Sequence, residues 1–550
     1  MDSSNCQCLN SQFLKEDIMF VNVSLCILLA PMLLMLVGLL PSRWANRNPA
    51  LIGSLCYKVA MAALLISILA AVSRETLSDQ AFAQRVIGFS FGPTVLSMDV
   101  YYNSVTMILL MLVSFVGVIV TRYSIRYLHG DPNQGRFFKW LSLTLASILS
   151  LIVSGNLIMF MTAWVATSLC LHQLLMFYGD RPAAVLAAHK KFVASRIGDV
   201  SLIAAVVLIG SSLHTFEFSE IFRVMGEYKD SLPLALQLAS FLVVLSAALK
   251  SAQFPLHGWL VQVIEAPTPV SALLHAGIVN AGAFLVIRMS PILSFSPAAL
   301  GLLAVIGLIT LALASLVMLT QTSIKVSLAW STVAQMGFML LECGLGLYSL
   351  AMLHLVAHSL YKAHAFLASG SGVDSFRAPQ LPHSPSGFRP GRLALSLAIS
   401  IMMAGTIALA FGLTPRQQPA LLATTAIVAI AVSQLLLQAA NMDRTPPFLL
   451  RALGLSLMAC VAYFALHDAF ARLLQDSAIP LRATGAFQYT LAVLVVIFFL
   501  FLLLLQHIFR NARGGVWEAT YVHLYNGMYV DVYITRMLQK LWPLPQTILA

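Results

Sequence analysis

Apolar residues dominate this chain in long runs, and short polar stretches interrupt them at regular intervals. Each run approaches the roughly 20 residues that a helix needs to cross the hydrocarbon core of a bilayer. We therefore expect an all-α polytopic membrane protein with about fifteen transmembrane helices. These helices are predicted near 20–40, 52–72, 104–121, 139–154, 157–177, 197–212, 233–249, 267–288, 298–320, 325–343, 348–369, 392–412, 420–439, 452–472 and 488–508.

Two of the apolar stretches contain helix breakers. The stretch SAALKSAQFPLHGWL includes Pro255 and Gly258, and the stretch EAPTPVSALLHAG includes two prolines and Gly277. Broken helices at membrane depth are tolerated where they line a cavity, and in transporters they form ion sites; a proline kink that serves packing alone is the alternative. Because Lys250 and His275 lie beside the breaks, we expect two broken helices with an ion-conducting role.

The charged residues are few and unevenly placed. They make up 10% of the chain, against about 25% in soluble domains. The net charge of +11 does not indicate nucleic-acid binding, because the Lys and Arg residues gather in alternate loops, as the positive-inside rule requires. These basic loops are 41–50, 122–139, 180–191, 373–392 and 441–451. The pattern predicts a multi-pass membrane protein with its N-terminus outside and its C-terminus in the cytoplasm.

The seven cysteines indicate no cofactor site. Most of them lie in apolar runs, where a small buried side chain is their expected role. Cys6 and Cys8 form an isolated C-x-C pair, whereas a structural zinc site needs four ligands. We expect no metal or other cofactor in this chain.

Lysine and histidine side chains in apolar segments are the strongest functional signal. His354, His358 and Lys362 follow one another at intervals of four residues, so they share one helical face with about 6 Å between steps. Bridging waters could carry protons along such a line, although His354 and His358 could instead bind a metal. Lys250 ends an apolar run, where it is either a proton relay or a side chain that reaches the membrane interface.

Further candidates extend this line of ionisable groups. Lys325 opens the predicted span 325–343, which carries a stripe of hydroxyl and amide side chains suited to water. His275 could link the region of Lys250 to Lys325. Asp199 and Arg196 in SRIGDVSL form either a structural ion pair at the membrane surface or part of the relay.

These segments resemble a known superfamily. SAALKSAQFPLHGWL and APTPVSALLHAG, followed by SIKVSLAWSTVAQMGFM and HLVAHSLYKAHAFLASGS, are similar to the proton-translocating antiporter-like membrane subunits of complex I and of multisubunit cation/proton antiporters. TRYSIRYLHGDPNQGRFFKWLSL and KKFVASRIGDVSLI resemble the subunit L type of complex I. The resemblance covers about residues 95–375. It implies an antiporter-like fold in which Lys250, His275, Lys325, His354, His358 and Lys362 carry protons.

The chain departs from the complex I pattern at two places. Val165, in MTAWVATSLCLHQLL, stands where complex I subunits carry a glutamate, and His172 is the nearest ionisable group on the same face that could replace it. The span near 392–412 has no interior lysine, although such subunits usually carry one there. In these two losses, and in its aromatic tail YVHLYNGMYVDVYITRMLQKLW, the chain resembles the DabB family. The members of that family are the membrane subunits of Dab inorganic-carbon systems.

The resemblance to the DabB family implies a function. We expect a subunit, not itself an enzyme, that couples a proton or sodium gradient to the uptake of CO2 or bicarbonate. Its implied partner is a cytoplasmic DabA-like subunit with a carbonic-anhydrase-like zinc site. The alternatives are a pumping subunit of a complex I-like oxidoreductase, a cation/proton antiporter subunit, and a structural subunit with vestigial lysines.

The sequence also suggests how the chain is divided. The predicted parts are N-terminal helices at 1–95, a proton-translocation core at 96–373, a cytoplasmic linker at 374–391, C-terminal helices at 392–510, and a cytoplasmic amphipathic tail at 511–550. The tail is predicted either to lie at the membrane surface or to bind a partner.

Overall fold

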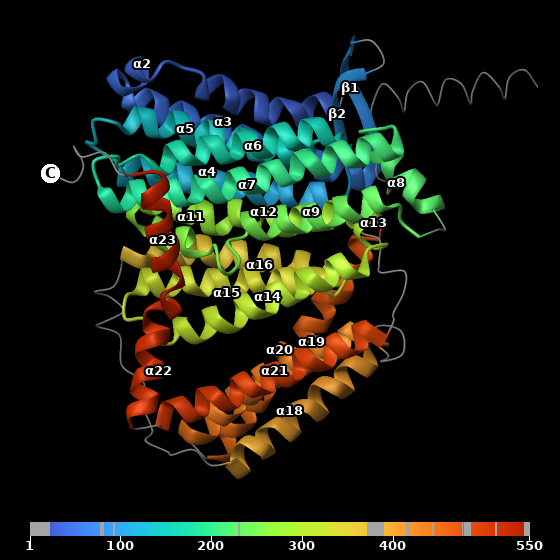
Figure 1. Ribbon diagram of the computed structural model, residues 1–550, viewed down its shortest axis with the longest axis vertical. Helices are drawn as coiled ribbons and strands as arrows, with labels where there is room; N and C mark the ends of the chain where they lie inside the picture. Colours follow the sequence, from blue (N-terminus) through green and yellow to red (C-terminus); the bar gives the residue numbers. More distant parts are fainter. Residues whose placement is uncertain are drawn as a thin grey trace, which may run out of the picture.

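The chain is a bundle of long helices that run side by side and are crossed at one end by the C-terminal segment (Figure 1). A computed structural model describes residues 23–77, 82–91, 94–228, 231–370, 390–413, 419–442, 445–475, 477, 486–511 and 514–543. Within these residues, eleven helices are long and apolar enough to cross a membrane. Three shorter apolar helices are Val23–Gly38, Leu234–Lys250 and Tyr489–Leu505.

The first described part consists of helices and one hairpin. The helix Val23–Gly38 is followed by α2 (Ser42–Arg47) and α3 (Pro49–Leu77). Strands β1 (Phe82–Phe91) and β2 (Thr94–Tyr102) then pair antiparallel, with a bulge between Arg85 and Ile87. The hairpin is fastened to the bundle because the Gly155 amide donates to the Asp99 carbonyl oxygen at 2.7 Å.

The central helices form the buried part of the bundle. They are α4 (Ser104–Tyr127), α5 (Gln134–Val153), α6 (Leu157–Leu175), α7 (Pro182–Leu213), α8 (Phe218–Glu227), α9 (Leu234–Lys250), α14 (Pro297–Met318), α15 (Ile324–Gly344) and α16 (Tyr348–Leu367), which ends in η3 (Ala368–Gly370). Side-chain caps start two of them: Asn103 accepts from the Thr106 amide, and Asn156 accepts from the Met159 amide.

The two predicted breaks are present. Helix α9 ends at Lys250, and the chain turns before the short helices α10 (Gly258–Gln262) and η1 (Val263–Glu265). The next span is divided into α11 (Thr268–Ala276), η2 (Ile278–Asn280) and α12 (Ala281–Arg288), and α13 (Ser290–Leu293) follows it. Both breaks lie inside the protein. Buried residues at the first break are Ser251 and Gln253, and those at the second are Ile278 and Asn280. This placement agrees with the rule for non-helical backbone at membrane depth.

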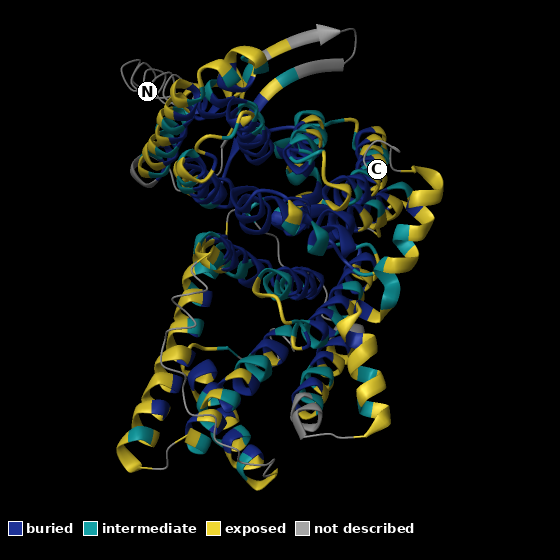
Figure 2. Ribbon diagram, turned by 90° about the vertical axis from the view of Figure 1, so that its left-hand side faces the viewer, coloured by how far each residue is buried: buried dark blue, intermediate teal, exposed yellow. Residues whose placement is uncertain are grey.

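Four C-terminal helices form a separate group beside the core (Figure 1). They are α18 (Pro390–Ala410), α19 (Pro419–Met442), α20 (Pro446–Leu473) and α21 (Ala486–Asn511). Their surfaces are largely exposed, whereas the central helices are buried (Figure 2). Helix α18 lies on the side of the group that is farthest from the core (Figure 1).

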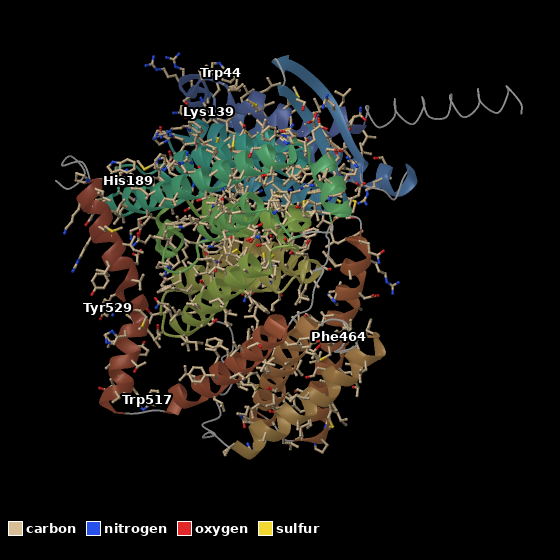
Figure 3. The ribbon with its side chains drawn as sticks, turned by 45° about the vertical axis from the view of Figure 1, so that its right-hand side comes forward. Trp44, Lys139, His189, Phe464, Trp517 and Tyr529 are labelled. Atoms are coloured by element: carbon tan, nitrogen blue, oxygen red, sulfur yellow. The ribbon has the colours of Figure 1, made fainter. Side chains whose placement is uncertain are left out.

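The tail consists of α22 (Gly515–Tyr525), η4 (Gly527–Tyr529) and α23 (Val530–Leu541). It runs across the ends of the core helices, at the end of the bundle that also holds α2 (Figure 1). The labelled side chains of His189, Tyr529 and Trp517 follow this edge from α7 to α22 (Figure 3). We call this end of the bundle the tail face, and the end with β1 and β2 the hairpin face.

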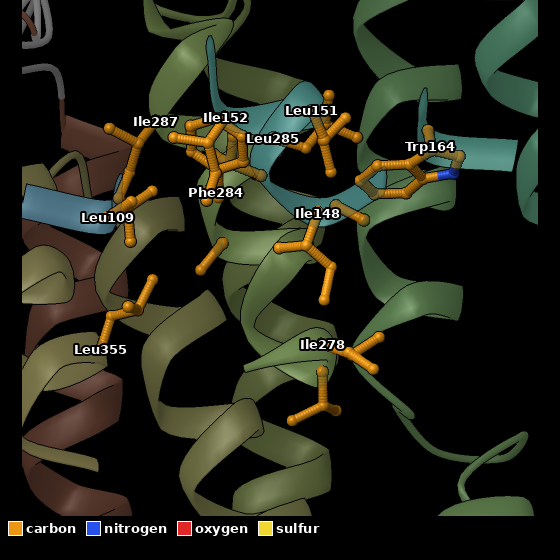
Figure 4. Close-up of a cluster of buried hydrophobic side chains, with 14 of the residues drawn as sticks. Leu109, Ile148, Leu151, Ile152, Trp164, Ile278, Phe284, Leu285, Ile287 and Leu355 are labelled. Atoms are coloured by element: carbon orange, nitrogen blue, oxygen red, sulfur yellow. The ribbon is translucent and has the colours of Figure 1, made fainter. Parts of the chain in front are cut away.

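The core is closely packed. An apolar cluster that includes Leu109, Ile148, Trp164, Phe284 and Leu355 joins helices α4, α5, α6, α12 and α16 (Figure 4). Small residues allow α14 and α15 to approach each other. A Cβ atom at Gly307 would lie 2.5 Å from the Gly337 carbonyl oxygen, and one at Gly337 would lie 2.7 Å from the Gly307 oxygen. Glycine is therefore needed at this crossing, as in other membrane helix pairs.

The helical prediction is confirmed, with two differences. Each of the fifteen predicted spans coincides with a helix or with a broken helix pair. The hairpin was not predicted, although alternating residues in 94–102 are typical of a strand. The prediction of a loop over 180–191 was wrong: α7 begins at Pro182, and Lys190 and Lys191 are buried within it. Cys6, Cys8 and most of the predicted linker lie outside the described residues.

Candidate functional site

Lys250 is held inside the bundle by α6. Its ammonium donates to the Ser168 hydroxyl at 2.9 Å and to the Trp164 carbonyl at 3.3 Å, and it lies 4.3 Å from the centre of the Trp164 ring. The residue is 6% exposed. Lys250 therefore does not extend to the membrane interface, because its charged end is directed at a neighbouring helix.

A second lysine approaches the same serine from α7. The Lys191 ammonium donates to the Ser168 carbonyl oxygen at 2.7 Å, and Lys191 is 2% exposed. Asp199, farther along α7, forms an ion pair with Arg196 and interacts electrostatically with both lysines. Asp199 is buried in the middle of α7. Two lysines thus converge on Ser168, and one carboxylate interacts electrostatically with both of them.

His172 lies at the edge of this group. Its ring is 5.2 Å from that of Phe192, and its charged neighbours are Lys191, His189 and Arg196. The groups that interact electrostatically with Lys250 are Asp199 and Arg196. The carboxylate that faces Lys250 in this structure is therefore supplied by α7.

A cavity of about 30 Å³ separates the Lys250 region from the second group of ionisable residues. Its lining is mostly apolar, but it includes Thr167, Asn280 and Ser359. Asn280 donates to the Ser359 hydroxyl at 2.8 Å, and its carbonyl oxygen has no hydrogen-bond partner among the described residues. The volume is sufficient for one or two waters, since one water needs about 10–15 Å³ by this measure. The helix break at 277–280 therefore borders a space in which water can connect α6 to α16.

The second group lies on α11 and α16. Lys362 is fully buried, and its ammonium donates to the Ser331 hydroxyl at 2.9 Å and to the Leu328 carbonyl at 3.0 Å. His275 is also fully buried and stacks on Phe366 with 4.2 Å between ring centres. His358 interacts electrostatically with His275, His354 and Lys362. The two ring nitrogens of His275 and those of His358 have no hydrogen-bond partner among the described residues, so they can bind water.

His354 is fixed by two side chains of α15. Its Nδ1 lies 2.9 Å from Glu342 Oε2, and its Nε2 lies 2.7 Å from Gln335 Oε1. The centres of the His354 and His358 rings are 6.3 Å apart, close to the predicted spacing of one helical step. Both nitrogens of His354 are thus occupied by protein side chains, which leaves no free nitrogen for the alternative metal site.

Lys325 lies at the tail face, apart from the buried groups. Its ammonium donates to the Thr268 hydroxyl at 3.2 Å, at the start of α11. Thr268 in turn donates to the Tyr127 hydroxyl at 3.3 Å. Lys325 therefore contacts the first residue of α11, the helix that carries His275.

The tail is attached to the core beside the first break. Asp531 of α23 accepts hydrogen bonds from Lys190 at 2.8 Å and from Gln262 at 2.7 Å. It is also in contact with the backbone at Gly258, where a Cβ atom would overlap its carboxylate. Trp542 stacks on His189 with 4.0 Å between ring centres. The tail therefore binds the residue next to Lys191 and the break that follows Lys250.

Sequence reasoning did not identify Ser168, Lys191, Glu342 and Asp531. Lys191 was assigned to a loop, and Ser168 is an ordinary residue in an apolar helix. Glu342 had a usable signal, because it is the only acidic residue in the predicted span 325–343 and intramembrane acids are rare. Asp531 had none, since its partners are more than 250 residues away in the sequence.

Comparisons with known proteins agree on one superfamily. The family model described as "NADH:quinone oxidoreductase/Mrp antiporter, TM" matches residues 154–418, and that for "NADH-Ubiquinone oxidoreductase (complex I), chain 5 N-terminus" matches residues 89–138. Among solved structures, the chain is similar to a chain of the Mrp complex from Dietzia sp. DQ12-45-1b, with a TM-score of 0.55 and 21% identity. The match covers 94% of this chain and 57% of that one, and it supports the fold.

Several curated relatives share more of their sequence with this chain than that solved structure does. The "Probable inorganic carbon transporter subunit DabB2" of Halothiobacillus neapolitanus is 44% identical over 88% of each chain. The "Probable inorganic carbon transporter subunit DabB" of Hydrogenovibrio crunogenus is 37% identical over 80% of this chain and 83% of its own length. The chloroplastic "NAD(P)H-quinone oxidoreductase subunit 5" of Lemna minor is 39% identical, but the match covers 52% of this chain and 38% of that one.

Proposed function

Because the chain belongs to the family of the DabB inorganic carbon transporter subunits, we propose that it couples a cation gradient to the uptake of CO2 or bicarbonate. The observation that carries the proposal is the pair of buried lysines, Lys250 and Lys362. Each is held by a serine hydroxyl and a carbonyl oxygen, and a cavity bordered by a broken helix lies between their helices. Buried ionisable groups in membrane helices mark ion and proton paths.

The coupled cation is a proton in this proposal, with sodium as the other candidate. Imidazole and ammonium groups take up and release protons, and the path contains Lys250, His275, His358, Lys362 and His354. Lys325 joins it from the tail face, and Asp199 with Arg196 adjusts the charge around Lys250. His172 borders this first group of residues.

The chemistry of carbon hydration belongs to a partner. The relatives are named as transporter subunits, which supports assembly into a complex. We propose a cytoplasmic DabA-like zinc subunit as the partner, with the zinc held there and no catalytic site in this chain. We propose that it binds at the tail face of a bacterial inner-membrane protein. The positive-inside rule supports this side, because it favours a cytoplasmic position for the face with the basic loops and an N-terminus outside.

Alanine substitutions of the two lysines test this function. Cells that depend on this transporter are expected to lose most bicarbonate accumulation when Lys250→Ala or Lys362→Ala replaces the wild type. Ser240→Ala is the matched control, because within the described part of the chain that hydroxyl bonds its own helix, at the Leu236 carbonyl. Accumulation at the wild-type rate in both lysine variants would exclude the relay. Co-purification with quinone- or iron–sulfur-binding subunits would favour an oxidoreductase instead.

A further inference from the structure

Glu342 is a buried carboxylate that the path described above does not use. It is 3% exposed and lies two residues before the end of α15. Its partner is His354 on the neighbouring helix, at 2.9 Å. A carboxylate in a membrane helix is costly to bury, and its retention calls for a pairing or a function.

The position of Glu342 places it at the far end of the path. Helix α15 begins at the tail face, where Lys325 lies and where Gln321, just before it, donates to the Tyr525 carbonyl of the tail. Glu342 follows Lys325 by seventeen residues of this helix, so at about 1.5 Å per residue it lies about 25 Å closer to the hairpin face than Lys325 does. Among the described carboxylate, histidine and lysine side chains of α15 and α16, Glu342 and His354 are therefore those closest to that face.

The surroundings of Glu342 connect the core to the C-terminal group. Tyr463 of α20 interacts electrostatically with the carboxylate, and Cys343 is the adjacent titratable group on α15. Phe338 lies between the His354 ring, at 5.2 Å, and Phe499 of α21, at 5.8 Å. The helix that lacks an interior lysine, α18, lies on the far side of this group (Figure 1). A charged side chain on α18 would thus be separated from His354 by other helices, whereas Glu342 is in contact with it.

The contacts of His354 allow it to change its protonation state in place. An ionised carboxylate only accepts hydrogen bonds, so Nδ1 carries a proton toward Glu342. The Gln335 amide at Nε2 presents either its oxygen or, after a half-turn, its NH2 group. The first orientation suits an imidazolium and the second a neutral ring. Either state is therefore hydrogen-bonded, as repeated proton transfer requires.

We propose that Glu342 is the carboxylate that exchanges protons with His354, as the last acid–base group of the path before the hairpin face. In the forward direction, the Nδ1–H bond of the imidazolium breaks and the Glu342 carboxylate gains that proton, which leaves a neutral imidazole and a carboxylic acid. The acid then releases its proton to water. The neutral ring, which keeps its Nε2–H bond, turns so that the vacant Nδ1 accepts the next proton from the side of His358, and this restores the imidazolium. This inference rests on the proposed function. It assigns the last proton-releasing group of the path to α15, because α18 has no interior lysine.

The test is gradient-driven bicarbonate uptake in proteoliposomes that contain the full chain with its partner. Glu342→Gln keeps the shape and the hydrogen-bonding capacity of the side chain but cannot carry the proton. We expect it to lower uptake at least about tenfold, a modest share of what a positioned acid–base group contributes. Glu342→Asp retains an acid and is expected to give intermediate uptake with a shifted pH profile, so it remains informative should the glutamine variant fail to assemble.

Glu220→Gln is the control acid. The Glu220 side chain is exposed on α8, where a hydrogen bond from Arg223 holds the pKa of the carboxyl below its usual range. Its replacement is expected to leave uptake unchanged. Wild-type uptake and an unchanged pH profile in Glu342→Gln, together with loss of uptake in Lys250→Ala, would overturn this inference alone. Wild-type uptake that ignores the imposed gradient would instead overturn the proposed function.

Discussion

The ion pair between Asp531 and Lys190 is expected to hold the tail against the core. The Lys190 side chain is 3% exposed and that of Asp531 is 27% exposed. Removing one partner of a fully buried ion pair costs about 3–5 kcal/mol, because the other charge is left unpaired. Since water reaches part of Asp531, we expect a smaller cost of about 2 kcal/mol for Asp531→Asn. This energy corresponds to an approximately 30-fold increase in the population with an undocked tail.

Hydrogen exchange of the intact protein in detergent measures this population. The amides of Val530–Leu541 in Asp531→Asn are expected to exchange about 30-fold faster than in the wild type, because local opening controls their exchange. Gly258→Ala is expected to have the same effect from the opposite side, since its methyl group would displace the carboxylate.

Asp468→Asn provides the matched control. It removes an exposed ion pair with Arg472 on α20 and is expected to leave the tail unchanged. Equal exchange rates in Asp531→Asn and the wild type would refute the reasoning, because they would show that the other contacts of the tail suffice to hold it.

Two further predictions concern packing and the lysine site. Gly337→Ala is expected to lower the stability of the protein in thermal unfolding by about 1–3 kcal/mol, because the added methyl group meets the Gly307 backbone. Gly405→Ala on α18 is the control: its methyl group meets nothing within 4 Å, so it is expected to be neutral or slightly stabilising. An unaffected Gly337→Ala protein would show that α14 and α15 can separate freely. Ser168→Ala removes the hydroxyl that holds Lys250 and is expected to lower gradient-driven uptake several-fold without changing exchange in the tail; full uptake would mean that the Trp164 carbonyl alone positions the ammonium.

The number and placement of the helices could be predicted from the sequence. Apolar runs of membrane-spanning length are a strong signal, because every such run has one low-energy structure in a bilayer. The breaks near Pro255 and Gly277 were also predictable, since proline interrupts a helix and glycine weakens one. The start of α7 was misjudged because Lys190 and Lys191 resemble loop residues when their partners are unknown. Their partners, Asp531 and Ser168, are supplied by distant parts of the fold.

The site was predictable in composition but not in its connections. The shared face of His354, His358 and Lys362 follows from helical spacing alone, and the structure places their helix α16 against α11 and α15. The pairing of His354 with Glu342 depends on the register between two helices, which spacing within one helix does not determine. The same holds for the tail, whose amphipathic sequence is compatible with a lipid surface, a partner or its own core. The structure shows that it binds its own core.

Coupling between the cation gradient and bicarbonate uptake is the central claim. Its most direct test is uptake of labelled bicarbonate by proteoliposomes that contain the purified complex, with and without an imposed cation gradient. We predict that uptake by the wild type requires the gradient, and that Lys250→Ala and Lys362→Ala remain at the level seen without one. Equal uptake by the wild type and both variants, whatever gradient is imposed, would contradict the claim.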